Sequence, residues 1–428
     1  MRQAIALLVG AALVAVAAVL PAPEAPEPPE VVPPEYPGTA TDLGFCPTWT
    51  VDDVVASALV LAVAEEIEAS LDFQADDEVL TEAVGRSGAG TVSADPGLAQ
   101  GYVPVLVDGL SGDPVAAGVV TTGDGLLAAS ACARWSAVRW TVGVGGTLEG
   151  ESTTLVLHNP SVQASTVAIE VFSDQGLEIG EGFGSVTVPP LGALELPVTG
   201  DLRLRERLVF VVDDPAGAIV PAIDHRSGGT DRAVAVGVPE AIEWFFPTTG
   251  GAEGELVLVN AGTESVAVEV DLFRPDGAEL GATAILLEPR AIEVVPLDGG
   301  AGVRVRADEP VGAAVRTESG GGLGATMGLS TEAVDWALPG LGVGPGQPTM
   351  AILNVGAESV EVTYRVLGPG GATVGRTISV PGGTVSFQEL EIQNASGVLV
   401  EASAPVTVGW HTIVPGGPLG VAPGIPRG

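Results

Sequence analysis

The chain has 428 residues, with 54 acidic and 17 basic side chains and a net charge of −37. A surface of this sign repels nucleic acid and anionic lipid headgroups, so we expect neither as a partner. The sequence contains no Lys, which excludes a phosphate-loop lysine, a Schiff base and a Ser-Lys pair.

The N-terminus predicts export. Residues 4–20 are an apolar run that follows Arg2, and such a run is either an export signal or a short membrane anchor. An uncleaved anchor with Arg2 on the cytoplasmic side is favoured, because the candidate cleavage site at residues 15–17 lies inside the run. Residues 21–42 are a Pro-rich linker that predicts an extended spacer. The expected location is extracytoplasmic, membrane-anchored by residues 4–20 or secreted.

The next segment, LVLAVAEEIEASLDF at 59–73, is rich in the helix formers Ala, Glu and Leu. Its second half nevertheless places Ile67, Ala69, Leu71 and Phe73 at alternate positions, the period of a strand. Its place in the repeat described below also favours a strand. We therefore predict β structure here, against the local propensity.

A related segment occurs three times: LVLHNPSVQASTVAIEVFSDQG at 155–176, LVLVNAGTESVAVEVDLFRPDG at 256–277 and AILNVGAESVEVTYRVLGPGG at 351–371. In the second copy Val266, Val268 and Val270 alternate with Ala267 and Glu269, which predicts a half-buried strand. A short strand precedes it, and the Asn between the two (159, 260 and 354 in the three copies) is interpreted as turn chemistry without a ligand.

Proline and tryptophan markers extend this pattern to four copies. Proline recurs at 114, 215, 310 and 405, at separations of 101, 95 and 95 residues, and tryptophan at 49, 140, 244 and 336. We predict repeats at residues 43–138, 139–240, 241–334 and 335–428. Each Trp is interpreted as a packing anchor. In the first copy Val63 replaces the turn Asn.

The predicted fold class is all-β, with four tandem immunoglobulin-like β-sandwiches of roughly 95 residues. An apolar N-terminal helix and the linker would precede this string of sandwiches. A β-propeller is the alternative architecture, but blades repeat at about 40 to 50 residues, so each copy would need two unlike blades.

Cys46 and Cys132 lie near the two ends of the first copy. An even cysteine count in an exported chain favours a disulfide. We predict that the two are joined, on opening and closing strands that lie side by side. The predicted bond closes a loop of about 86 residues.

The order of an apolar segment, a Pro-rich spacer, Cys46-Pro47, a second Cys before Trp140, a Gly-rich turn and LVLHNP resembles an exported actinobacterial family, domain of unknown function 5719. The stretches VLVNAGTESVAVEVDLF and LLEPRAIEVVPL resemble the adhesion-related immunoglobulin-like domains of bacterial surface proteins. Neither resemblance implies a catalytic residue.

No motif supports catalysis, and we predict no enzyme, no cofactor and no metal site. His158, His225 and His411 occupy different copies and share no repeat position, and we expect His225 at the surface. Asp224-His225 lacks the G-x-S-x-G sequence of a nucleophile elbow. The acidic groups at 52–53, 76–78 and 213–214 lack the ordered spacing of a calcium loop.

Two functions remain for the sequence. The first is a non-enzymatic, exported cell-envelope protein that acts as a modular structural or interaction scaffold for an envelope protein or a glycan. The alternative is an extracellular carbohydrate-binding protein that uses Trp135 and Trp410 as a sugar platform, which requires both side chains to be exposed. An exported hydrolase would rest only on scattered His and Asp.

Overall fold

The computed structural model describes residues 44–50, 56–63, 67–75, 78–86, 89–94, 101–108, 115–123, 126–133, 137–180, 183–228, 231–250, 253–277, 280–297, 301–319, 322–368, 370–390 and 396–427. All of them belong to one compact body, Pro33–Gly428. The predicted anchor and linker lie outside the described residues. Within these ranges, no helix has the length and apolar character needed to span a membrane.

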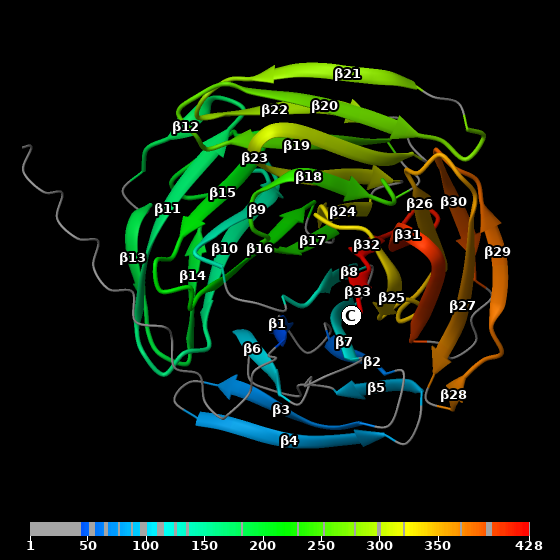
Figure 1. The fold of residues 1–428 in the computed structure, drawn as a ribbon. Helices are drawn as coiled ribbons and strands as arrows, with labels where there is room; N and C mark the ends of the chain where they lie inside the picture. Colours follow the sequence, from blue (N-terminus) through cyan, green and yellow to red (C-terminus); the bar gives the residue numbers. More distant parts are fainter. Residues whose placement is uncertain are drawn as a thin grey trace, which may run out of the picture. The chain divides into compact units, whose positions relative to one another are not determined.

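The regular elements of the described residues are all β-strands, which confirms the predicted all-β class (Figure 1). We group them into four units. Unit 1 contains β1 Gly44–Thr50, β2 Ala56–Val63, β3 Ile67–Ala75, β4 Glu78–Arg86, β5 Gly90–Ala94, β6 Gly101–Asp108, β7 Val115–Gly123 and β8 Leu126–Ala131. Unit 2 contains β9 Arg139–Gly145, β10 Glu151–Asn159, β11 Ser165–Ser173, β12 Gly176–Glu178, β13 Gly184–Val188, β14 Gly192–Pro197, β15 Leu208–Asp213, β16 Val220–Ser227 and β17 Asp231–Val236.

The other two units have the same plan. Unit 3 contains β18 Ala241–Phe246, β19 Glu253–Asn260, β20 Val266–Phe273, β21 Leu280–Leu287, β22 Ala291–Leu297, β23 Gly302–Ser319 and β24 Gly322–Met327. Unit 4 contains β25 Ala333–Pro339, β26 Gln347–Asn354, β27 Val360–Gly368, β28 Gly371–Ala372, β29 Arg376–Val380, β30 Thr384–Glu389, β31 Gly397–Ile413, β32 Leu419–Pro423 and β33 Ile425–Pro426.

The structure confirms the strand predictions, including the one made against helix propensity. Residues 59–63 lie in β2 and residues 67–73 in β3, so the period prevails over helix propensity there. In β20, Val266, Val268 and Val270 are buried and Ala267 is exposed, as the alternation predicted. The Asp-Gly turn after β20 closes with a hydrogen bond from the Gly277 amide to the Arg274 carbonyl.

Each unit is a sandwich of two antiparallel sheets built from non-consecutive strands. In unit 1 the sheet orders are β1-β6-β3-β4 and β5-β2-β7-β8. The core lies between the sheets: in unit 3, Trp244 and Val268 from one sheet and Leu256 from the other belong to one buried cluster. A propeller blade made of four consecutive strands would not interleave in this way.

One long strand links the two sheets in units 3 and 4. In β23, residues 302–307 pair with β20 and residues 312–318 pair with β19. Pro310 lies between these two ladders. Proline has no N–H to donate, and at this position the ladders do not require one. In unit 2 the corresponding stretch is divided into β15 and β16. The carboxylate of Asp214 accepts hydrogen bonds from the amides of Ala218 and Ile219 at 2.5 and 2.6 Å and holds the intervening loop.

The recurring Asn is a buried clamp between two turns. The Nδ2 group of Asn260 donates to the carbonyls of Glu264, Leu287 and Glu288 at 2.8 to 3.3 Å, and its Oδ1 accepts from the Gly262 amide. Equivalent sets of bonds surround Asn159 and Asn354. The side chain makes hydrogen bonds to carbonyl and amide groups of the turns that have no partner in a neighbouring strand. This confirms its interpretation as turn chemistry.

Replacing Asn260 by Ala is expected to lower the free energy of unfolding by about 2 kcal/mol, because it leaves buried carbonyls without a donor. Urea denaturation followed by circular dichroism measures the change. Glu264→Ala is the control, since this exposed side chain lies in the same turn while the bonded carbonyl belongs to the backbone. A loss below about 0.5 kcal/mol for Asn260→Ala, the usual range of surface changes, would contradict the clamp.

The four units are not an extended string, as the sequence suggested, because they contact one another in a closed cycle. The last strands of the units meet: β17 contacts β8 and β24, and β32 contacts β24 and β8. We call β8, β17, β24 and β32 the inner strands; they lie near one another in Figure 1. Units 4 and 1, distant in sequence, share a core that contains Ala62, Ala116, Ala337 and Leu399.

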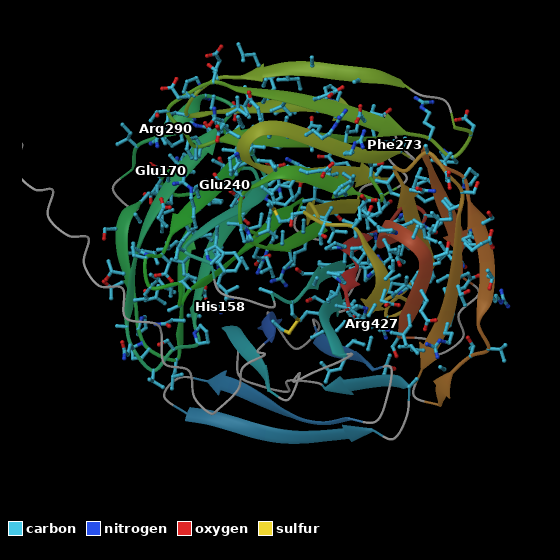
Figure 2. All side chains as sticks on the ribbon, viewed as in Figure 1. His158, Glu170, Glu240, Phe273, Arg290 and Arg427 are labelled. Carbon is cyan, nitrogen blue, oxygen red and sulfur yellow. A yellow bond between two sulfur atoms is a disulfide. The ribbon has the colours of Figure 1, made fainter. Side chains whose placement is uncertain are left out.

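The junctions between consecutive units are also buried. Val257 and Val259 of unit 3 belong to the main core of unit 2. Arg290 of unit 3 pairs with Glu170 of unit 2 at 2.7 Å, and its guanidinium lies 5.6 Å from the centre of the Phe172 ring (Figure 2). Such shared cores couple the sandwiches mechanically, because separating two units would expose apolar surface.

Candidate functional site

The inner strands line a partly open cavity of about 170 Å³ at their C-terminal ends. Each inner strand is the edge of its own sheet, so all four units contribute an edge to this place. The cavity wall consists of residues 129–133, 234–239, 325–331 and 423–426, with Trp140, Trp244 and Val421. Among these described residues none is charged.

Small residues allow the inner strands to approach closely. A Cβ at Gly420 in β32 would lie 3.0 Å from a side-chain carbon of Leu127 in β8. A Cβ at Gly324 in β24 would lie 3.0 Å from the side chain of Val421. Contacts this short require the neighbour to move, so glycine at both positions brings the strands together. The Ala- and Gly-rich composition of the inner strands therefore has a packing cause.

The cavity wall includes two of the Trp anchors predicted from the repeat. Trp140, Trp244 and Trp336 are all buried, which confirms the packing role of these three; the side chain of Trp49 lies outside the described part. The indole Nε1 groups of Trp244 and Trp336 donate to the carbonyls of Val311 and Val406 at 2.9 and 3.1 Å. In the described residues Trp140 Nε1 has no such partner.

A set of exposed aliphatic side chains lies at the same end of the inner strands. Val138, Ile242 and Val334 each stand two residues before a Trp anchor and are 63%, 57% and 42% exposed. Short connections join the ends of β8, β17 and β24 to the next strands; β18 and β25 carry Ile242 and Val334, and Val138 directly precedes β9. We call the three residues the rim. Their repetition in three units distinguishes them from apolar residues exposed singly.

Charged groups beside the rim are partly paired. Arg139 lies 3.2 Å from both Asp213 and Glu240. Burial raises the pKa of Glu240, and Arg139 opposes that shift. Burial likewise raises the pKa of Asp213, again against the effect of Arg139. This triad links unit 2 to the connection that leads into unit 3.

The structure contains the predicted disulfide between Cys46 and Cys132, whose Cα atoms are 4.5 Å apart. The strand geometry expected for it was wrong, however. Cys46 lies in β1, which pairs with β6, and Cys132 follows β8, which pairs with β7 in the other sheet. The bond therefore joins the two sheets of unit 1, and Cys132 forms part of the cavity wall.

The expectation that His225 lies at the surface is wrong, and the other two histidines are buried as well. His158, His225 and His411 are 2%, 0% and 6% exposed. Burial lowers the pKa of His158 to about 4 and that of His411 to about 4. Burial, helped by the charge of Arg316, lowers the pKa of His225 to about 3.

The structure gives Asp224 and His225 separate partners. The carboxylate of Asp224 binds Arg232 and Arg226, and the first of these pairs is almost fully buried. Burial alone would raise the pKa of Asp224, but the two guanidinium groups lower it overall. The Nδ1 atom of His225 lies 3.0 Å from the Thr153 hydroxyl. Neighbouring residues of a strand point to opposite faces, which explains this division.

The remaining predicted candidates are not brought together. Trp410 is 1% exposed inside the core of unit 4, so it offers no face to a sugar, and Trp135 lies outside the described residues. Of the acidic groups, residues 52–53 and 76–77 also lie outside. Asp213 pairs with Arg139, and Asp214 holds its loop. The described chain contains no cluster of His, Cys, Asp or Glu that would hold a metal.

Sequence reasoning missed the cavity and the rim. One signal was available for the rim, because an aliphatic residue precedes the Trp by two positions at 138, 242 and 334. An aliphatic residue on the same side of a strand as a core Trp is ordinarily read as part of the core. The β-bulges that interrupt pairing beside Ile242 and Val334 change the side on which they point.

Comparison with known proteins identifies a family. The model of the Family of unknown function (DUF5719) matches residues 112–335 and again residues 238–419. The chain belongs to this family. The two matches overlap in unit 3, as expected for a chain of related units. No curated protein matches the chain.

Proposed function

We propose that this member of a family of unknown function is a non-enzymatic protein of the cell envelope, located outside the cytoplasm and acting as an interaction scaffold. The partner is an envelope protein that binds at the rim. The observation that carries the proposal is the recurrence of an exposed aliphatic side chain at one repeat position in three units, each a few residues along the chain from the cavity wall.

The closed cycle suits such a role. A binding surface made from three units keeps its geometry only if the units are fixed to one another, and here they share buried cores and ion pairs. Arg316 of unit 3 and Glu151 of unit 2, for example, are 4% and 9% exposed and form a salt bridge. A rigid apolar surface loses little conformational entropy on binding, which favours affinity.

The export part of the proposal is supported by the apolar N-terminal run and the Pro-rich linker. It is also supported by the disulfide, since such bonds persist in oxidising compartments. The acidic surface keeps the protein away from anionic lipid headgroups, so the scaffold would stand off a membrane surface rather than lie on it.

A photo-crosslinking experiment tests partner and location together. A photo-reactive residue replaces Ile242 in the full chain, and irradiated wall-less cells are then treated with protease. We expect one crosslinked species of defined mass, lost on external proteolysis. Val138→Ser with Val334→Ser should reduce the yield at least tenfold.

The matched control for this experiment is Ile179→Ser with Val374→Ser, because these aliphatic side chains are 93% and 90% exposed. They follow β12 and β28, which lie away from the inner strands in Figure 1. This control should leave the yield unchanged. Equal loss in both double variants, or complete protection of the crosslinked species from protease, would overturn the proposal.

A further inference from the structure

We infer that the cavity between the inner strands is a binding site for a small, neutral, mainly apolar molecule of about the size of one substituted benzene ring. The volume is the first argument. At about 170 Å³ the cavity is below the usual range for drug-sized ligands, about 300 to 1,000 Å³. It is close to the roughly 150 Å³ of an engineered apolar cavity that binds benzene.

The chemistry of the wall is the second argument. The chain carries 54 acidic and 17 basic residues, yet no described residue of this wall is charged. A charged ligand would lose its hydration here without gaining a counter-charge, which costs several kcal/mol. An apolar ligand instead gains contact with side chains such as Val236, Met327 and Ile425.

The two buried hydroxyl groups in the wall are already engaged, whereas those of Ser330 and Thr331 belong to exposed residues. Ser130 Oγ donates to the carbonyl of Ala131 at 3.1 Å, and Thr326 Oγ1 donates to that of Met327 at 3.1 Å. Each bond lies within its own inner strand or at its end, so a ligand need not satisfy either hydroxyl proton. A ligand therefore needs few hydrogen-bonding groups to match this wall. The cavity would discriminate between ligands by their size and by the absence of charge.

The position of the cavity is the third argument. Protein cores are usually filled to the density of organic crystals, and the sandwich cores of this chain are closely packed clusters. This hollow instead lies where four edge strands meet, and its wall runs on through residues 131–133, 237–239 and 328–331 toward the rim. A ligand bound here would contact all four units at once.

Calorimetric titration of the full chain with p-xylene, followed by ligand-observed NMR, tests the inference. We expect saturable binding with one site per chain. The charged analogue 4-methylbenzoate should bind at least tenfold more weakly. Ala325→Leu places a larger side chain in the wall and should weaken p-xylene binding at least tenfold. Ala372→Leu, at an exposed site in β28, should bind as the unmodified protein does.

Absence of saturable binding, equal affinity for 4-methylbenzoate, or no effect of a folded Ala325→Leu would each overturn the inference. If Ala325→Leu does not fold, Ala235→Val reduces the same cavity by less and should still weaken binding. Val138→Ser with Val334→Ser should bind p-xylene normally, so failure of the partner proposal and failure of this one are distinguishable.

Discussion

Replacing Cys46 and Cys132 together by Ser is expected to lower the free energy of unfolding by about 4 kcal/mol. The bond closes a loop of 86 residues, and on the chain-entropy estimate a loop of this length gives a stabilisation of that size. Because the bond joins the two sheets of unit 1, its loss acts on that unit first. Unit 1 also lacks the Asn clamp, since Val63 takes the clamp's place in the strand register opposite Gly90.

Guanidinium denaturation of the double variant and of the oxidised protein measures this loss. The reduced protein should behave like the double variant, and a reductant should not alter the double variant itself. A difference below about 1 kcal/mol would show that the two sheets of unit 1 hold together without the bond. Two free thiols in exported protein, found by mass spectrometry, would contradict the disulfide itself.

Local patterns in the sequence predicted the strands well. Alternation of Val266, Val268 and Val270 is set by the geometry of a pleated strand, and it required no knowledge of what covers the buried face. The clamp at Asn260 was predictable for the same reason, because the bonds to Glu264 and Gly262 are local. The repeat boundaries also placed Cys46 and Cys132 in the same predicted unit.

The closed cycle was not predictable, because its causes are not local. Nothing in the sequence around Ala116 states that Leu399 will share its core. The small residues of the inner strands allow four strand edges to pack together, and this role cannot be recognised from one strand alone. Gly420, which lies beside Leu127, is an example. The cavity follows from this meeting, so no motif marks it.

The burial of His158 could have been predicted from the sequence. The residue before each clamp Asn is Val259 in unit 3, Leu353 in unit 4 and His158 in unit 2. Two aliphatic residues at one repeat position predict a buried site, and the imidazole occupies the same register. Treating the histidines one by one, rather than by repeat position, hid this relation.

Acid is therefore expected to destabilise the protein as the pH falls below about 6.5. The pKa of His158 is about 4 in the folded chain and 6.5 without burial. Between these values the unfolded state binds a proton that the folded state does not, so stability falls as pH decreases from about 6.5 to 4. Above 6.5 the contribution is constant. The difference corresponds to about 3 kcal/mol for this histidine.

His158→Leu isolates this effect, since Leu is the residue that unit 4 uses at the same position. In the described residues neither ring nitrogen of His158 has a hydrogen-bond partner, so the substitution removes two unsatisfied polar atoms from the core. We expect the variant to be more stable than the unmodified protein. Its advantage should grow by about 2 kcal/mol between pH 7.5 and pH 5.

Urea denaturation at a series of pH values measures that growth. Leu353→Val is the control, because it shortens a buried side chain at the matching position without changing a titratable group; its cost of about 1 kcal/mol should be the same at every pH. His225 and His411 remain in both variants and cancel from the comparison. A gap between His158→Leu and the unmodified protein that stays constant with pH would show that His158 takes up its proton as readily in the folded core as in the unfolded chain, and its pKa would then not be lowered by burial.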